Sequence, residues 1–304
     1  VLNIKELLEE GQIDQTEYDK LLLLSKRQTT SLAFNLLLGL GIVATSIGAI
    51  ALAPSPYSCL LFGLIVSVVG LLFKIKVSDQ WMVLSITCII SGLLLISAAI
   101  VWFEDYWFQT TTYRSVSVIV FILGFSAYFL KSSLLFALSV LSLSTLLSLG
   151  VGYEFASYFI WIEYPLLTII TFSILSICFY SLSKKVSGDD EKLLITGSRV
   201  SVLLVNLGFW IGSLFGDIWL EPAYFFSIMW ALAILGVGYW AWKANRVWLI
   251  NVLGVFGSIH FYTQWFETLG AQPESLFLGG VIAVGIAILF KRFNNNLKVE
   301  TQEN

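Results

Sequence analysis

The chain has 304 residues, of which 58% are hydrophobic and only 12% are charged, and its mean hydropathy is +0.86. Soluble domains are about 45–50% apolar and about 25% charged, so this composition excludes a disordered chain and argues against a soluble globular domain. The net charge of −3 gives no reason to expect nucleic acid as a partner. We therefore expect an all-α integral membrane protein whose main partner is the lipid bilayer.

Apolar segments that are long enough to cross a bilayer recur along the chain. A spanning helix needs about 20 mostly apolar residues, with a range of about 17–25. Short breaks separate some segments: Pro54-Ser55-Pro56 stops a helix by its prolines, and Lys131 alone separates the fourth segment from the fifth. We predict about ten transmembrane helices, at residues 31–53, 57–73, 81–102, 115–130, 132–149, 165–182, 200–216, 223–241, 247–262 and 275–290.

The basic residues alternate with these predicted spans. If the N-terminus lies inside, all but one of the 17 Lys and Arg residues fall on the inner side, and the exception is Arg114. Such a bias is what the positive-inside rule predicts. It also checks the count of spans, because a missed or extra span would scramble the alternation downstream. We expect a multi-pass protein of the bacterial inner membrane with both termini in the cytoplasm.

The sequence predicts that the chain consists of three segments. Residues 1–30 are predicted to form a cytoplasmic amphipathic helical hairpin, residues 31–290 the transmembrane domain, and residues 291–304 a polar cytoplasmic tail. In the first segment Gly11 can end one helix, and Asp14 followed by Glu17 resembles a capping box at the start of the next. The hairpin either caps the first span or acts as a docking or oligomerisation element.

The two ends of the chain are similar to a known family. Residues 7–18, Leu-Leu-Glu-Glu-Gly-Gln-Ile-Asp-Gln-Thr-Glu-Tyr, resemble the helix–Gly–x–Ile–helix unit that opens a bacterial family of membrane proteins, the domain of unknown function 2157. That family often carries an Asn-Trp pair where the first span leaves the membrane, whereas this chain has Leu52-Ala53-Pro54. The resemblance implies a multi-span inner-membrane protein and supplies no activity and no catalytic residue. The other similar positions are Leu38-Gly39-Leu40-Gly41, Arg246, Phe261-Tyr262, Phe266 and Gly279-Gly280.

Acidic and aromatic residues are interleaved at the predicted outer boundaries, for example in residues 102–108 and 158–164. One interpretation is an interfacial belt of aromatic side chains with solvated acids. The other is a collar for a cation, a sugar or an amine, since stacked rings and carboxylates suit such groups. The candidate contacts at this outer face are Glu104, Asp105, Glu163, Asp217, Glu221, His260 and Glu267.

The predicted spans contain no Asp, Glu, Lys or Arg. Intramembrane charges mark ion pathways and proton relays, so a pump with a midplane carboxylate is not indicated. Asn206 and Asn251 are the candidates for an intramembrane polar site on neighbouring spans, and interhelical hydrogen bonding is their alternative role. His260, the single histidine, fits either a structural role at the interface or proton transfer with Glu267 or Asp217.

No motif for a metal, a cofactor or a catalytic nucleophile is present, and Cys59, Cys88 and Cys178 are isolated in apolar runs. We therefore expect no cofactor, no metal and no enzymatic activity. The first hypothesis is a scaffold, an assembly component or a sensor, with other membrane or periplasmic proteins as candidate partners. The alternative is a small-solute transporter or channel, because ten spans in about 300 residues with both ends inside is also the build of drug/metabolite transporters.

Overall fold

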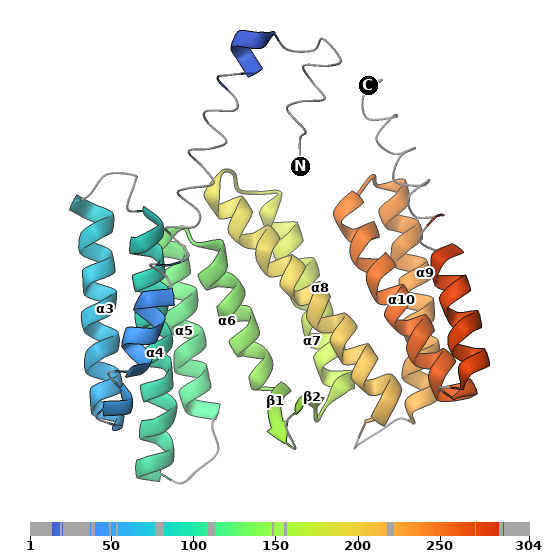
Figure 1. Ribbon diagram of the computed structural model, residues 1–304, viewed down its shortest axis with the longest axis horizontal. Helices are drawn as coiled ribbons and strands as arrows, with labels where there is room; N and C mark the ends of the chain where they lie inside the picture. Colours follow the sequence, from blue (N-terminus) through green and yellow to red (C-terminus); the bar gives the residue numbers. More distant parts are fainter. Residues whose placement is uncertain are drawn as a thin grey trace. The chain divides into compact units, whose positions relative to one another are not determined.

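The structure is a computed structural model in which two compact units are distinguished, Val1–Ser115 and Val116–Asn304. Both units consist mainly of α-helices, and the second also contains a two-stranded β-sheet (Figure 1). Most of the predicted N-terminal hairpin and all of the predicted tail at 291–304 lie outside the described residues. The described residues are 14–18, 20, 37, 40–48, 50–52, 54–76, 82–108, 113–147, 149–154, 157–217, 222–270, 272–285 and 288.

Six helices in the described part of the chain are long and apolar enough to cross a membrane. The membrane-protein architecture expected from the composition is thus supported, whereas a count of ten spanning helices is not. These six helices are α3 (Pro56–Lys76), α4 (Met82–Phe108), α5 (Tyr113–Leu130), α7 (Pro165–Ser183), α8 (Asp189–Phe215) and α9 (Ala223–Lys243).

The other four predicted spans coincide with helical segments that fall short in length or in composition. The helix α6 (Ser133–Thr145) has 13 residues, which at about 1.5 Å per residue is about 20 Å, less than the ~30 Å hydrocarbon core. The apolar helices Leu40–Leu52 and Pro273–Gly285 are short as well. The helix α10 (Val247–Leu269) has 23 residues, but Asn251, His260 and Gln264 lower its hydropathy.

Several helices continue beyond the apolar segments that predicted them. The helix α8 begins at Asp189 rather than at residue 200, α4 includes Glu104 and Asp105, and α10 includes Glu267. The predicted spans contain no charged residue, but the longer helices that include them do. Hydropathy marks the part of a helix that is apolar, whereas the backbone hydrogen bonds continue past it into the polar boundary zone.

A β-hairpin follows α6, where the sequence predicts the end of a span and an outer loop. Its strands β1 (Leu149–Glu154) and β2 (Ser157–Ile162) are antiparallel, with Leu149 opposite Ile162. Gly150 lies opposite Trp161, and a Cβ atom on Gly150 would approach the indole ring to 2.3 Å. The glycine thus makes room for the tryptophan, and the hairpin is an addition to the predicted all-α fold.

The described start of the chain confirms the predicted capping box of Asp14 and Glu17. Residues 15–18 form a helical turn, and the backbone N–H of Glu17 donates to the Asp14 Oδ1 atom at 2.7 Å. The backbone N–H of Asp14 donates in return to the Glu17 Oε2 atom at 3.2 Å. These reciprocal bonds are a capping box with Asp in the capping position.

In the first unit, α3 and α4 are in close contact through small residues. A Cβ atom on Gly92 would lie 2.6 Å from both the Gly63 carbonyl oxygen and the Ser67 backbone nitrogen. The Ser85 hydroxyl donates across the same interface to the Gly70 carbonyl oxygen at 2.7 Å. This is the close approach that small residues allow between membrane helices. At Gly236, by contrast, a Cβ atom would meet nothing within 4 Å.

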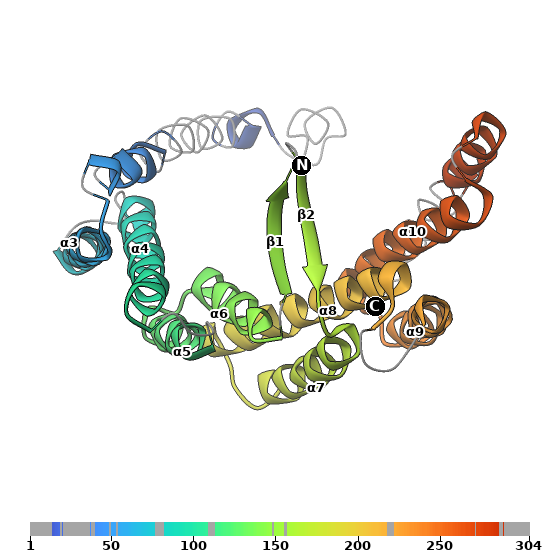
Figure 2. The ribbon, with the colours of Figure 1, turned by 90° about the horizontal axis from the view of Figure 1, so that it is seen from below.

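In the second unit, α8 contacts α6, α7, α9 and α10 (Figure 2). Small residues on α8 admit these neighbours: Gly197 lies against the Phe136 ring of α6, and Gly212 lies against the Phe226 ring of α9. The buried residues Val140, Phe172 and Leu204 join α6, α7 and α8 in one apolar cluster. The fold of this unit is therefore organised around α8.

The turns that follow α5, α7 and α9 lie at the same end of the second unit (Figure 1). Lys131 forms the α5–α6 turn with φ +53°, and its ammonium group pairs with Asp190 at 2.5 Å, at the start of α8. The opposite end holds the β-hairpin and the carboxylates of Glu163, Asp217 and Glu267. The described basic residues of this unit lie in the three turns or in the adjoining parts of the helices: Lys131, Lys184, Lys185, Lys192, Arg199, Lys243 and Arg246.

Candidate functional site

Glu104, the first of the predicted outer contacts, holds two helix ends together. Its carboxylate is buried and accepts a hydrogen bond at 3.0 Å from the backbone N–H of Ser115, in the first turn of α5. The first N–H groups of a helix have no partner inside the helix, and a carboxylate near them is stabilised by the helix dipole. Glu104 is therefore a long-range helix cap rather than a group that faces a ligand.

Asp217 is a long-range helix cap in the second unit. It follows the end of α8, and its Oδ2 atom accepts a hydrogen bond at 3.1 Å from the backbone N–H of Leu166 in the first turn of α7. The neighbouring residue Pro165 begins that helix and needs no partner for its nitrogen. The carboxylate thus ties the end of α8 to the start of α7.

The remaining outer acids do not form a collar in the described residues. Asp105, Glu163 and Glu267 are exposed, and Glu163 accepts a hydrogen bond at 2.9 Å from the hydroxyl of its neighbour Tyr164. Glu221 lies outside the described residues. Among the residues that the structure describes, no three His, Cys, Asp or Glu side chains are grouped so that they could hold a metal ion.

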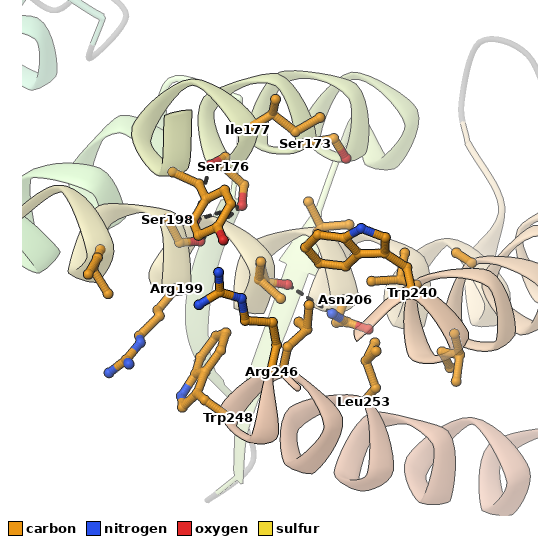
Figure 3. Close-up of a pocket in the computed structure, with 18 of the residues that line it drawn as sticks. Ser173, Ser176, Ile177, Ser198, Arg199, Asn206, Trp240, Arg246, Trp248 and Leu253 are labelled. Carbon is orange, nitrogen blue, oxygen red and sulfur yellow. Dashed lines mark hydrogen bonds between the residues drawn. The ribbon is translucent and has the colours of Figure 1, made fainter. Parts of the chain in front are cut away.

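A pocket of about 630 Å³ lies in the second unit, lined by α7, α8, α9 and the start of α10 (Figure 3). Pockets for small organic molecules have volumes of about 300–1,000 Å³ and mostly apolar walls. Aliphatic side chains such as Ile177, Val202 and Leu253, together with aromatic ones such as Phe209, form most of these walls. The pocket is large enough for a small organic solute.

Asn206 lies in the wall of this pocket and is hydrogen-bonded to two neighbours. Its amide oxygen accepts a hydrogen bond at 3.0 Å from the indole N–H of Trp230, and its amide nitrogen donates to the Val202 carbonyl oxygen at 2.9 Å. Asn206 and Trp230 are both buried. Asn251, the predicted partner of Asn206, is exposed on α10 and is not among the lining residues. The two asparagines therefore do not form a joint site.

His260 extends the cluster around Trp230. Its ring lies edge-on to the indole at a centroid distance of 4.8 Å. The buried Nδ1 atom of His260 has no hydrogen-bond partner in the described part of the chain. Neither predicted proton-transfer partner joins this cluster. Glu267 is exposed, and Asp217 accepts a hydrogen bond from the start of α7. The histidine belongs to the α9–α10 contact.

Two arginines line the pocket near the α9–α10 turn. The Arg246 guanidinium lies 5.5 Å from the centre of the Tyr180 ring, and the Arg199 guanidinium lies 5.0 Å from the Trp248 ring. In Figure 3 Arg246 points toward Ser198, whereas Arg199 extends away from it. Within the described residues neither arginine forms an ion pair, and no lining residue is acidic. One end of the pocket is therefore positively charged.

Two hydroxyl groups lie beside this charged end. The Ser176 hydroxyl on α7 and the Ser198 hydroxyl on α8 are 3.1 Å apart, and each also donates to the other residue's carbonyl oxygen, at 3.2 Å from Ser176 and 3.1 Å from Ser198. Sequence reasoning assigns Arg199 and Arg246 to inner loops and misses this site. The available signal is that both arginines directly adjoin predicted spans, at residues 200 and 247.

Comparisons of the chain with models of protein families, with curated proteins and with solved structures give no match. The resemblance to the domain of unknown function 2157 therefore stays a prediction.

Proposed function

We propose that this protein is a multi-pass membrane protein that binds a small organic solute in the α7–α10 pocket and carries it across the bilayer. The observation behind the proposal is the cavity of about 630 Å³ among helices that are apolar enough for a membrane. Such a pocket, with mostly apolar walls and a few polar groups, is typical of a ligand site.

The scaffold, assembly or sensor role remains the competing hypothesis. It needs contact surfaces for partner proteins, for which the collar of outer carboxylates is the candidate feature. Two of those carboxylates, Glu104 and Asp217, are instead bonded to backbone N–H groups at helix starts. The pocket therefore favours solute binding over a purely structural role.

The proposed topology keeps ten crossings of the bacterial inner membrane with both termini inside. Its support is the antiparallel course of successive helices in the second unit and the clustering of their Lys and Arg residues at one end (Figure 1). The helix α6 is too short to span alone. It nevertheless returns the chain to the opposite end, where the β-hairpin begins, and so preserves the alternation.

Access to the pocket from water tests the proposal. In a variant without Cys59, Cys88 and Cys178, Val205→Cys places a thiol in the pocket wall, and Leu203→Cys places one on the exposed side of the same helix. A water-soluble thiol reagent should modify the cysteine at 205 and not the one at 203, which faces lipid.

The side of the membrane from which the reagent reaches residue 205 distinguishes a carrier from a sensor. Modification at 205 in both right-side-out and inverted vesicles is the result expected for a carrier. Modification from one side only contradicts transport and favours a sensor. Absence of modification from either side contradicts a solute pocket that opens to water.

A further inference from the structure

The pocket has one cationic end and an apolar body, and this asymmetry limits what it can bind. We infer that its ligand is an amphipathic anion, with the acidic group held near Arg246 and the hydrocarbon part lying along α8 and α9. This inference rests on the proposed solute-binding function and names the chemical class of the ligand.

Among the residues that the structure describes, no acidic side chain pairs with the arginines at the charged end. Lys131 and Lys192 pair with Asp190 and Asp189, so their charges are balanced locally. Arg246 and Arg199 instead lie over aromatic rings, and a ring holds a guanidinium in place without neutralising it. The planar guanidinium keeps N–H donors that match a carboxylate or a phosphate.

The Ser176 and Ser198 hydroxyls add polar groups close to this position. They lie on facing surfaces of α7 and α8, near Arg246 (Figure 3). Each donates to a backbone carbonyl oxygen in the absence of a ligand, and a hydroxyl can rotate to serve a new acceptor. An anion near Arg246 would thus meet a guanidinium and two hydroxyl donors.

The rest of the pocket does not demand a polar ligand. The amide of Asn206 and the indole N–H of Trp230 already satisfy each other. Most of the remaining lining is apolar, with Val202, Val205 and Val237 among it, and its other polar residues are Ser173 and Asn245. A sugar would lose the hydrogen bonds of its hydroxyl groups in such surroundings, and a cation would be repelled by the arginines. A hydrocarbon chain that ends in one acidic group suits both parts of the pocket.

Binding of a brominated fatty acid tests this inference, because bromine quenches nearby indoles and Trp230 and Trp240 line the pocket. The full chain in phosphatidylcholine nanodiscs should show saturable quenching by 11-bromoundecanoate and much weaker quenching by its neutral methyl ester. Arg246→Gln should raise the dissociation constant about tenfold or more, as expected for loss of a charge-assisted hydrogen bond. Arg199→Gln should raise it less.

Lys243→Gln is the matched control, since it removes a positive charge at the same end but outside the pocket lining. It should leave the dissociation constant within about twofold of the wild type. Equal binding of acid and ester, or equal effects of Arg246→Gln and Lys243→Gln, would overturn the inference and leave the solute pocket intact.

A pocket-filling variant, Ala233→Phe, separates failure of the inference from failure of the proposed function. If it abolishes binding of both probes equally, the pocket is a solute site without preference for anions. If neither probe shows saturable quenching in the wild type, and Ala233→Phe changes nothing, the solute site and the inference both fail.

A further experiment distinguishes an anion that comes from the membrane from one that enters from water. Replacing part of the phosphatidylcholine by phosphatidylglycerol should weaken apparent binding of 11-bromoundecanoate if the natural ligand is an acidic membrane lipid. Unchanged binding in those nanodiscs indicates an anion that enters from water. Both outcomes support the amphipathic anion as the ligand class.

Discussion

The indole N–H of Trp230 donates a hydrogen bond to the amide oxygen of Asn206, 3.0 Å away, and thereby joins α9 to α8 in the wall of the pocket. Both side chains are buried among apolar neighbours, where an unpaired polar group is costly. The same bond that satisfies these two groups also sets the spacing of two walls of the pocket.

Asn206→Leu should destabilise the second unit, because it leaves the Trp230 N–H without its acceptor. Hydrogen bonds between membrane helices contribute on average about 0.6 kcal/mol and up to about 1.7 kcal/mol. Unfolding of the purified chain in mild detergent, followed by tryptophan fluorescence, measures the change. The double variant Asn206→Leu/Trp230→Phe should lose less than the sum of the single changes, and strict additivity would contradict a direct bond.

Glu104→Ala should reduce stability, whereas Asp105→Ala should have little effect. The first removes the buried acceptor for the Ser115 backbone N–H, and the second removes an exposed carboxylate next to it. Loss of a helix-capping acceptor costs about 0.5–2 kcal/mol. Thermal unfolding of the two variants side by side gives the comparison. Equal stability of the two variants would show that the capping bond contributes nothing.

Asp217→Ala should act in the same way on the second unit, by removing the acceptor for the Leu166 backbone N–H. Glu163→Ala, at an exposed acid near the same helix start, is the control. We expect a loss of stability without a change in the affinity of the pocket for its ligand. A change in affinity alone would return Asp217 to the role of a ligand contact.

Gly92→Leu should disrupt the contact of α3 with α4, because its side chain would collide with the backbone of Gly63 and Ser67. Overpacking of this kind costs about 1–3 kcal/mol. Gly236→Leu on α9 is the matched control, since a Cβ atom there meets nothing within 4 Å. Proteolysis of the two variants in membranes would show the difference as faster cleavage of the first. Equal resistance would contradict the close contact.

The contact of Lys131 with Asp190 predicts a loss of stability at high pH. The hydrogen bond with Asp190 is the main cause that raises the pKa of Lys131 above its ordinary value of 10.5. A raised pKa means that the contribution is fully present below pH 10.5 and is lost as pH rises through the folded-state value. The gap in unfolding temperature between the wild type and Lys131→Met should therefore be constant near neutral pH and shrink above about pH 10.5. A gap that does not change over this range would contradict the prediction.

Hydropathy alone predicts the order of the helices, because helices that cross a bilayer need long apolar segments. It could not place the start of α8 at Asp189, since those first turns are polar and lie beyond the apolar part. The α5–α6 turn at Lys131 falls where the sequence predicts it. The backbone of Lys131 is left-handed, a conformation that usually favours glycine, so this detail could not be predicted.

The pocket and the capping carboxylates are harder to predict from the sequence than the helices. Asn206 stands out in the sequence as a polar residue in an apolar segment, and it does line a pocket. The pairing of Glu104 with Ser115 and of Asp217 with Leu166 depends on how distant helix ends meet, which no local pattern encodes. Arg199 and Arg246 lie far apart in the sequence, so only the fold makes both of them lining residues of one pocket.

The central position of α8 sets an order for biogenesis. Chains leave the ribosome from the N-terminus, and segments that depend on a later partner have to wait for it. The helices α6 and α7 are synthesised before α8, yet the apolar cluster that joins them requires Leu204. This cluster can therefore be completed only after α8 has been synthesised. The second unit can then close around α8, and α9 and α10 complete the pocket last.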